Sequence, residues 1–211
     1  MSVWSSPARF LRHCRELAFD VVYGVDTAGI LRLSAVSTLS TANVAHGFKY
    51  EPVDIQVFDA IFGALRRDWR QHVFIDFGSG KGRALLLASR LPFRRIVGVE
   101  FSPELHRAAQ RNIRRFRGGN QQCRHIESVL GDAAEFEIPG EPAFFFFSNP
   151  FDQVVMRKVI DNISRSLRRA PREAWLVYAL HEHCPALREL LPADLFIEAR
   201  RSRWWVAYRT V

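Results

Sequence analysis

The chain reads Phe74-Ile75-Asp76-Phe77-Gly78-Ser79-Gly80-Lys81-Gly82-Arg83 where an apolar run gives way to a glycine-rich turn. The run from Val73 to Phe77 is typical of a strand buried on both faces. The alternate glycines let the backbone turn tightly and approach a ligand closely, and the apolar spacing after Lys81 predicts a helix. Because a helix N-terminus behind such a turn can hold a ligand, the stretch predicts a strand, a binding turn and a helix of an α/β fold.

The rest of the chain alternates between short strand-like and longer helix-like segments, which is typical of βαβ units around a parallel sheet. Four consecutive phenylalanines, Phe144 to Phe147, fit only a strand buried on both faces. The expected strands are 73–77, 95–100, 124–130, 143–148, 174–180, 195–199 and 204–208, the last two forming a terminal hairpin. The expected helices are 4–22, 53–70, 81–90, 103–117, 153–169 and 185–191, and 26–50 is expected to be a loop.

Spacing decides between three nucleotide-binding interpretations of the glycine-rich turn. A P-loop needs a glycine where Ile75 stands and a serine or threonine where Gly82 stands, so that interpretation fails. A dinucleotide site needs a third glycine where Arg83 stands, and the carboxylate of Asp76 would meet the pyrophosphate, which weakens that interpretation. The third pattern is D-x-G-x-G-x-G followed by an acid at the end of the next strand, and Glu100 stands there.

With this acid in place, residues 73–151 resemble a class I S-adenosylmethionine-dependent methyltransferase. The resemblance implies an α/β fold with a doubly wound, seven-stranded, mostly parallel Rossmann-like sheet, here with an N-terminal helical extension. S-adenosylmethionine carries an amino acid and a nucleoside but no phosphate. An acid near the glycine turn can therefore face its ammonium group, and a carboxylate after the second strand can accept both ribose hydroxyls.

The resemblance also implies which residues contact the cofactor and that no metal is needed. The glycine turn would line the methionine part, Glu100 would bind the ribose, and Asp132 with the next backbone N–H would bind the adenine. The implied set is Asp76, Gly78, Ser79, Gly80, Gly82, Glu100, Phe101, Asp132, Ala133 and Asn149. Taken singly, Glu100 could be a solvated strand end and Asp132 a helix N-cap.

The fourth strand ends in Ser148-Asn149-Pro150-Phe151, which resembles the (D/N)-P-P-(F/Y) motif of methyltransferases that modify amine or planar nitrogens. The resemblance implies two catalytic residues here, Asn149 to accept a hydrogen bond from the target N–H and Phe151 to pack on the target. Only one proline is present. A simple turn that opens the next helix is therefore the alternative.

A second catalytic element is indicated ahead of the core. The segment Gly47-Phe48-Lys49-Tyr50-Glu51-Pro52 resembles an aromatic-rich loop that closes over the cofactor in some lysine-directed methyltransferases. The resemblance implies that Tyr50 and Glu51 border the methyl-transfer channel. The alternative is an ordinary packed loop.

Composition and charge limit which of these interpretations are possible. The 211 residues are 48% hydrophobic and 25% charged, which fits one globular domain, and we expect residues 1–72 to form a helical cap with a pre-core loop and 73–211 the methyltransferase core. The net charge of +8 suits an anionic partner, and Arg111, Arg114 and Arg115 share one helix face. Arginine-rich codon usage and a solvated helix face explain the same facts.

Cysteine usage and hydropathy bear on location. Cys14, Cys123 and Cys184 are an odd number without a C-x-x-C pair, which suits a reducing compartment. The longest apolar run is Ala174 to Leu180, far too short to cross a membrane. We therefore expect a cytoplasmic protein without membrane contact. His181, His183 and Cys184 lie close together, but no second ligand pair with zinc-like spacing exists, so no metal is expected.

Four functions remain open at this level. The Asn149 motif and the Tyr50 loop favour methyl transfer to a protein amine of the lysine type. The basic charge favours RNA or DNA as the acceptor, although 211 residues leave no room for an added RNA-binding module. A non-catalytic S-adenosylmethionine-binding protein is the third hypothesis, and an oxidoreductase is a distant fourth. We predict a methyltransferase for which a protein substrate fits better than a nucleic acid.

Overall fold

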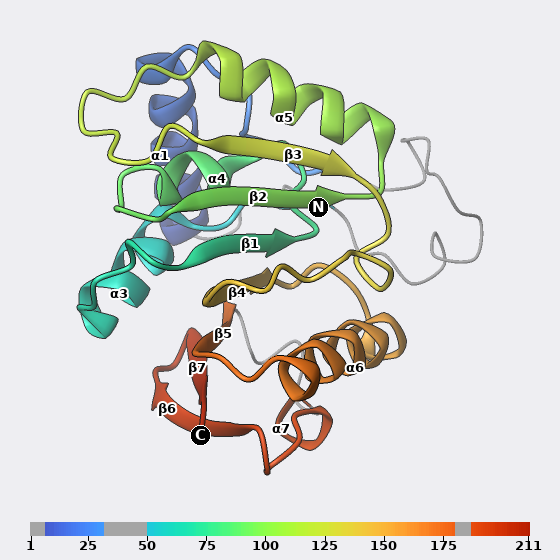
Figure 1. Cartoon of the computed structure of the whole chain (residues 1–211). Coiled ribbons are helices and arrows are strands. Elements are labelled where there is room, and N and C mark those ends of the chain that lie inside the picture. The colour runs from blue at the N-terminus through green and yellow to red at the C-terminus, as the bar shows by residue number, and fades with distance from the viewer. Residues whose placement is uncertain (1–6, 32–49, 180–186) are drawn as a thin grey trace.

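The computed structural model describes residues 7–31, 50–179 and 187–211. Its centre is a seven-stranded sheet in the order β3-β2-β1-β4-β5-β7-β6 (Figure 1). Strand β7 pairs antiparallel with both β5 and β6, and all other neighbouring strands pair in parallel. The strands are β1 (Val73–Phe77), β2 (Arg95–Glu100), β3 (Ile126–Leu130), β4 (Ala143–Ser148), β5 (Ala174–Ala179), β6 (Phe196–Arg201) and β7 (Trp205–Thr210). The predicted doubly wound, mostly parallel sheet with a terminal hairpin is confirmed.

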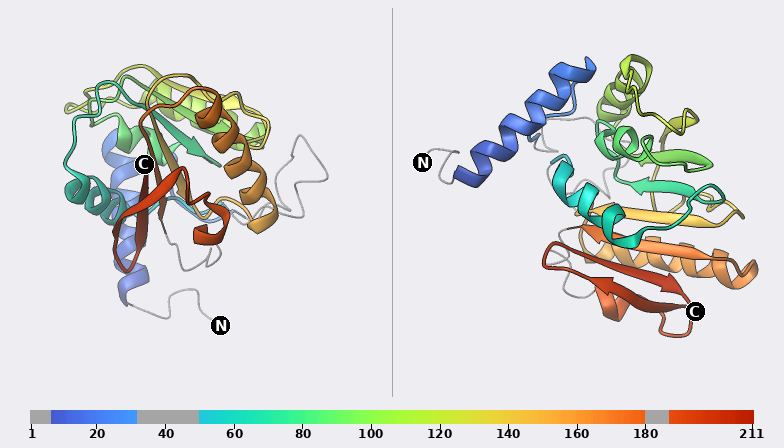
Figure 2. Two further views of the ribbon diagram at one scale, coloured as in Figure 1. Left: turned by 60° about the horizontal axis from the view of Figure 1, so that its bottom comes forward. Right: turned by 90° about the vertical axis from the view of Figure 1, so that its left-hand side faces the viewer.

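Helices cover both faces of the sheet (Figure 2). One face packs under α6 (Gln153–Arg169) and α7 (Leu187–Leu190). The other packs under α3 (Ile55–Leu65), α4 (Arg83–Ala88) and α5 (Pro103–Arg115), with α1 (Pro7–Tyr23) outside them. The phenylalanines of β4 alternate between the two faces: Phe145 and Phe147 join the α6 side, and Phe144 and Phe146 join the α3 side. All four rings are fully buried, as the sequence predicted.

The N-terminal residues share the core of the sheet. Phe19 of α1, Phe58 and Phe62 of α3, and Trp69 lie in one buried cluster with Phe74 of β1. The ring of Phe62 lies 5.0 Å from that of Phe144, and Trp69 is only 2% exposed. Residues on both sides of the predicted boundary at 72/73 therefore contribute to the same apolar cluster.

Several element boundaries differ from the expected ones. The helix predicted over 53–70 ends at Leu65, because Arg66 takes a left-handed φ of 35° and the chain then turns to bring Trp69 into the core. The third strand begins at 126 rather than 124, where pairing with Ile96 starts. The helix predicted from 81 begins at Arg83, because the glycine turn continues through Gly82.

The hairpin and two other predicted segments need separate comment. The sixth strand runs through to Arg201 across a bulge between Glu198 and Arg200, so the turn is 202–204 rather than 200–203. Within the described residues, the first predicted helix, 4–22, is found at Pro7–Tyr23, and the helix predicted over 185–191 is found at Leu187–Leu190. Residues 1–6, most of the predicted loop 26–50, and the cluster His181, His183 and Cys184 lie outside the described residues. Across the described ranges, no helix is both long and apolar enough to cross a membrane.

Candidate cofactor and methyl-transfer site

Four strand ends meet at one edge of the sheet. Gly78 directly follows β1, Glu100 ends β2, Asp132 lies two residues after β3, and Asn149 directly follows β4. Because β1 lies between β2 and β4, the strand order reverses there, and a doubly wound sheet opens a crevice at this point. The fold therefore brings the four predicted cofactor segments into one place.

The glycine turn adopts a conformation that other residues rarely reach. Gly78, Gly80 and Gly82 have φ of +78°, +55° and +87°. A Cβ on Gly78 would lie 2.5 Å from the Cβ of Pro150, and a Cβ on Gly80 would lie 2.3 Å from the ring of Tyr50. Both the backbone angles and the close neighbours therefore require glycine at the first two positions.

Glu100 fastens the glycine turn to the end of β2. Its Oε2 accepts a hydrogen bond from the Gly80 backbone N–H at 2.7 Å, and its Oε1 accepts one from Ser102 N–H at 2.9 Å. The side chain is 2% exposed. Burial raises the pKa of Glu100 to about 7, and the backbone hydrogen bonds oppose that rise. The carboxylate is therefore ionised at slightly alkaline pH and can accept further hydrogen bonds from a bound hydroxyl group.

Asp76 is the second buried acid of the site. It lies on β1 opposite Gly98 of β2 and Phe146 of β4, and it is 3% exposed. Burial, and after it the nearby charge of Glu100, raises the pKa of Asp76 to about 8. Two adjacent acids that resist ionisation form a site that a bound cation would stabilise.

One cavity lies between the ends of β1, β2 and β3. Its walls are mostly apolar, with one carboxylate: Gly78, Val99, Phe101, Gly131, Asp132, Ala133, Phe151 and Val155. The Asp132 carboxylate also accepts a hydrogen bond from Ala134 N–H at 2.9 Å, so it organises the turn after β3. An apolar cavity with a carboxylate acceptor in its wall suits a purine ring that carries an amino group.

A second cavity lies between the glycine turn and the end of β4. It is more polar and is lined by Tyr50, Glu51, Gly78, Gly80, Glu100, Phe101, Leu105, Ser148, Asn149 and Pro150. Gly78 and Phe101 line both cavities, so the two adjoin. A ligand with a purine at one end and a polar, charged chain at the other fits this pair of cavities.

The structure does not place all the predicted residues in the cavity walls. The Ser79 hydroxyl is buried toward Gly98 of β2, and Gly82 packs on Ala109 of α5, so neither lines a cavity. Asp76, buried within β1, does not line either cavity. Phe151 is 6% exposed and lies in the first cavity, whereas Tyr50 and Asn149 lie in the second. The sequence motif grouped Phe151 with Asn149, but the two residues line different, adjoining cavities. A sharp turn at Asn149, where φ is +50°, leads the chain into that position.

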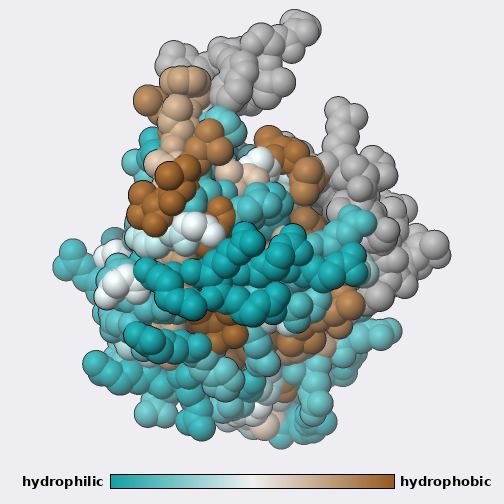
Figure 3. All heavy atoms as spheres, turned by 90° about the horizontal axis from the view of Figure 1, so that it is seen from above, coloured by the Kyte–Doolittle hydropathy of each residue, from teal (hydrophilic) through white to brown (hydrophobic). Residues whose placement is uncertain are grey.

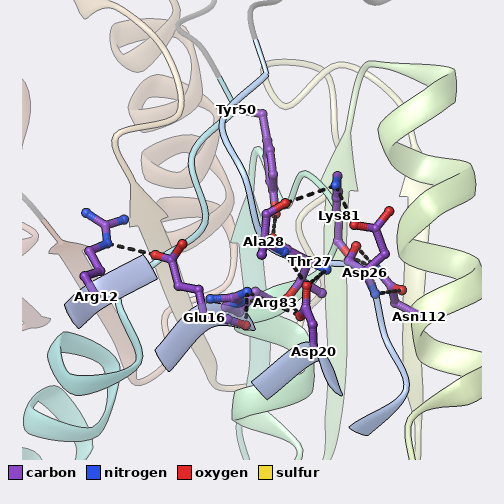
Figure 4. Close-up of polar contacts among 10 residues, drawn as sticks. All are labelled: Arg12, Glu16, Asp20, Asp26, Thr27, Ala28, Tyr50, Lys81, Arg83 and Asn112. Atoms are coloured by element: carbon purple, nitrogen blue, oxygen red, sulfur yellow. Dashed lines mark hydrogen bonds and ion pairs between the residues drawn. The ribbon is translucent and has the colours of Figure 1, made fainter. Parts of the chain in front are cut away.

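Tyr50 is held over the glycine turn by contacts that the sequence did not reveal (Figure 4). Its hydroxyl donates a hydrogen bond to the Thr27 carbonyl at 2.6 Å, and its backbone pairs with that of Leu31. Burial raises the pKa of the Tyr50 phenol, so it stays protonated and remains a donor. Thr27 lies in a stretch expected to be a loop, and no local pattern marks it as a partner of the site.

The comparisons with known proteins agree with this geometry. Residues 74–173 match a family model described as a methyltransferase domain. An RNA methyltransferase from Salinibacter ruber, crystallised with S-adenosylhomocysteine, aligns at a TM-score of 0.51 and 20% identity, over 75% of this chain and 92% of that one. A search among proteins of curated function found none that matches in sequence.

Two further structures share the fold but carry other names. A ribosomal protein L11 methylase from Lactobacillus delbrueckii aligns at a TM-score of 0.51 and 14% identity, over 74% of this chain and 77% of that one. A predicted N6-adenine-specific DNA methylase from Listeria monocytogenes aligns at a TM-score of 0.55 and 13% identity, over 76% of this chain and 51% of that one. At these identities the likeness concerns the fold alone.

The domain matched over residues 74–173, built on this doubly wound sheet, is that of a class I S-adenosylmethionine-dependent methyltransferase. Its cofactor is S-adenosylmethionine, and the two adjoining cavities fit that molecule. The adenine would lie beside Asp132, and the ribose and methionine beside Glu100 and Gly80. The cofactor residues assigned from the sequence remain predictions.

Proposed function

We propose that this methyltransferase modifies an amine nitrogen of a protein substrate, of the lysine type. The observation that supports it is the composition of the second cavity, where Asn149 and Glu51 line the same space as Tyr50. Phe151 lies in the other cavity. Since the motif's ring lines the other cavity, we take the acceptor to be an alkylamine held by Asn149 rather than a base stacked on Phe151.

Asn149 has the geometry expected of an orienting group. Its φ of +50° is uncommon for a residue other than glycine, and such conformations concentrate at functional sites. The Tyr178 hydroxyl lies 3.5 Å from the Asn149 Oδ1, which places the amide oxygen relative to β5. This oxygen can accept an N–H of a neutral amine without adding charge next to it.

The remaining chemistry is positional. The bound cofactor supplies an electrophilic methyl group, so the protein's task is to align a neutral amine with it and to exclude water. Glu51 lies at the cavity with its side chain 28% exposed and within 3.0 Å of Arg12. A carboxylate there can take up the proton that the amine releases, directly or through water.

RNA or DNA is the alternative acceptor, and the arginines of α5 are the observation in its favour. Arg111, Arg114 and Arg115 are exposed, as the predicted basic face requires. They follow Leu105, the α5 residue that lines the second cavity, by more than one helical turn, and they line neither cavity at the strand ends. The protein acceptor is therefore preferred. The cysteine count continues to favour a cytoplasmic location, which we also propose.

The test is transfer of a labelled methyl group. Purified chain is incubated with methyl-labelled S-adenosylmethionine and a cell extract, which is then divided between protease and nuclease. The expected result is label that protease releases and nuclease does not. Nuclease-sensitive label would establish the alternative, label in small molecules would exclude both, and no transfer at all would point to a cofactor-binding protein without catalysis.

A pair of asparagine variants tests the role of Asn149. We expect Asn149→Ala to abolish transfer while its affinity for S-adenosylhomocysteine, measured by calorimetry, stays close to that of the wild type. The matched control is Asn120→Ala, which changes an exposed loop residue and should leave both quantities unchanged. Full activity of Asn149→Ala would refute the role.

A further inference from the structure

Helix α1 turns charged side chains toward the core and several apolar side chains toward solvent. Its inward face buries the carboxylates of Glu16 and Asp20, which are 6% and 9% exposed. Its outward face carries apolar side chains, with Leu17 46% exposed and Val21 and Val22 82% and 72% exposed. Figure 3, which views the molecule from the side where α1 lies, shows hydrophobic residues gathered at this surface. Phe19, with Tyr23 beside it, packs α1 on the core, but the buried charges of the helix need an explanation of their own.

The buried carboxylate of Asp20 organises the turn that follows α1. It accepts hydrogen bonds from Thr27 N–H at 2.7 Å, from the Thr27 hydroxyl at 2.6 Å and from Ala28 N–H at 2.6 Å. Arg83, the first residue after the glycine turn, adds an ion pair to Asp20 at 3.4 Å. The same guanidinium donates to the Thr27 hydroxyl at 2.7 Å. Asp20 thus joins the turn at 27–28 to the start of α4 (Figure 4).

Thr27 connects Asp20 to the wall of the cofactor cavity. Its side chain and N–H bind Asp20, and its carbonyl accepts the hydrogen bond from Tyr50. The ring of Tyr50 lies directly against Gly80, at the wall of the second cavity. A continuous series of buried hydrogen bonds therefore runs from α1 through Thr27 to the ring that covers the glycine turn.

Helix α1 also holds the chain just after Tyr50. Arg12 donates a hydrogen bond to the Pro52 carbonyl at 2.9 Å, and it lies 3.0 Å from the Glu51 carboxylate. Lys81 of the glycine turn lies 5.8 Å from the Tyr50 ring and 2.8 Å from the Asp26 carboxylate. The segment around Tyr50 is thus fastened on both sides by residues that do not line the cavity themselves.

We propose that Asp20 is a positioning residue for the cofactor site, acting through Thr27 to hold the Tyr50 ring over Gly80. In this arrangement the buried polar face of α1 holds in place the residues that form one wall of the second cavity. The inference rests on the proposed role of that cavity in binding the cofactor. It assigns to the N-terminal helix a function in ligand affinity rather than in folding alone.

The first test compares two carboxylate variants. Asp20→Asn keeps the shape of the side chain but turns an N–H₂ group toward a donor, because the carboxylate accepts only from N–H and O–H groups. We expect the dissociation constant for S-adenosylhomocysteine, measured by calorimetry, to rise about tenfold or more. The matched control is Asp194→Asn, which breaks an exposed pair with Arg168 and should leave the affinity unchanged.

A second measurement separates positioning from mere loss of stability. The Tyr50 N–H donates to the Leu31 carbonyl at 2.7 Å, so its hydrogen exchange reports how well the segment is held. In Asp20→Asn we expect exchange at Tyr50 to accelerate more than exchange in β4. Tyr50→Phe, which removes only the hydroxyl and leaves every carboxylate intact, should weaken binding in the same direction.

A double-variant cycle decides whether Asp20 acts through Tyr50. In a Tyr50→Ala background, Asp20→Asn should change the affinity by no more than about twofold. Equal effects of Asp20→Asn in both backgrounds would overturn the inference, as would wild-type affinity in the single Asp20→Asn variant. Failure of the wild-type chain to bind S-adenosylhomocysteine at all would instead count against the cavity assignment itself, so the two failures are distinguishable.

Discussion

Replacing Gly80 by alanine tests the close contact between the glycine turn and Tyr50. The new Cβ would lie 2.3 and 2.4 Å from two ring carbons of Tyr50, well inside the 3.0 Å that real Cβ atoms keep. The φ of +55° adds a backbone cost of about 1–2 kcal/mol for any residue with a Cβ. Gly29→Ala is the matched control, since Gly29 also has a positive φ, of +89°, but nothing lies within 4 Å of its Cβ position.

The extra cost at Gly80 comes from displacing the ring. If Tyr50 moves, its hydroxyl loses the 2.6 Å hydrogen bond to Thr27, and a buried donor left without a partner costs about 1–3 kcal/mol. For a chain of this size each kcal/mol shifts Tm by about 2–4 °C. We therefore expect Gly80→Ala to melt roughly 2–12 °C below Gly29→Ala, and to bind S-adenosylhomocysteine more weakly.

Calorimetric melting of the two variants, each alone and with Tyr50→Ala, checks this reasoning. Once the ring is gone, Gly80→Ala and Gly29→Ala should differ little in Tm from each other, because each keeps only the backbone cost of a positive φ. The reasoning is refuted if Gly80→Ala is no less stable than Gly29→Ala, or if the gap between them persists without the Tyr50 ring.

Three further predictions concern the buried groups of the site. Because burial raises the pKa of Asp76 from 3.8 to about 8 in the folded chain, the stability of the wild type is lost progressively as pH rises from about 4 to about 8, so Asp76→Asn should gain in Tm relative to wild type across that range and no further above it. The pKa of Glu100 is raised to about 7, so wild-type affinity for S-adenosylhomocysteine should fall as pH drops below that value. In calorimetry, Glu100→Gln should bind S-adenosylhomocysteine weakly and with little dependence on pH. Phe151→Ala removes a ring that is 6% exposed and should cost about 3–5 kcal/mol in denaturant unfolding, whereas a loss below about 1 kcal/mol would contradict its place in the core.

Much of the fold was predictable because its signals are local. The phenylalanine run marks β4, the glycines mark the turn after β1, and Ser102-Pro103 marks the start of α5, where the Ser102 hydroxyl accepts from Leu105 N–H at 3.4 Å. Boundaries were less predictable. The end of α3 depends on Trp69 reaching the core, and the start of β3 depends on its pairing with β2.

Some residues of the site could likewise be predicted from the sequence, and others could not. Glu100 was identifiable because an acid at a strand end is visible in the sequence, and its hydrogen bond to Gly80 joins the two predicted motifs. That Phe151 lines the first cavity was not identifiable, because its place follows a turn of the chain at Asn149, where φ is +50°. The raised pKa values of Asp76 and Glu100 follow from burial, which spacing along the chain does not report.

By itself, the sequence determined the order of strands and helices, the glycine turn and the acid that follows it, since backbone preferences and apolar periodicity act over a few residues. Only the tertiary structure decided that the N-terminal helix turns its charges inward and reaches the site. The hydrogen bond between Tyr50 and Thr27 spans 23 residues, and that between Arg83 and Thr27 spans 56. Contacts at such separations form only when the packed sheet and helices bring those segments together, and no local pattern encodes them.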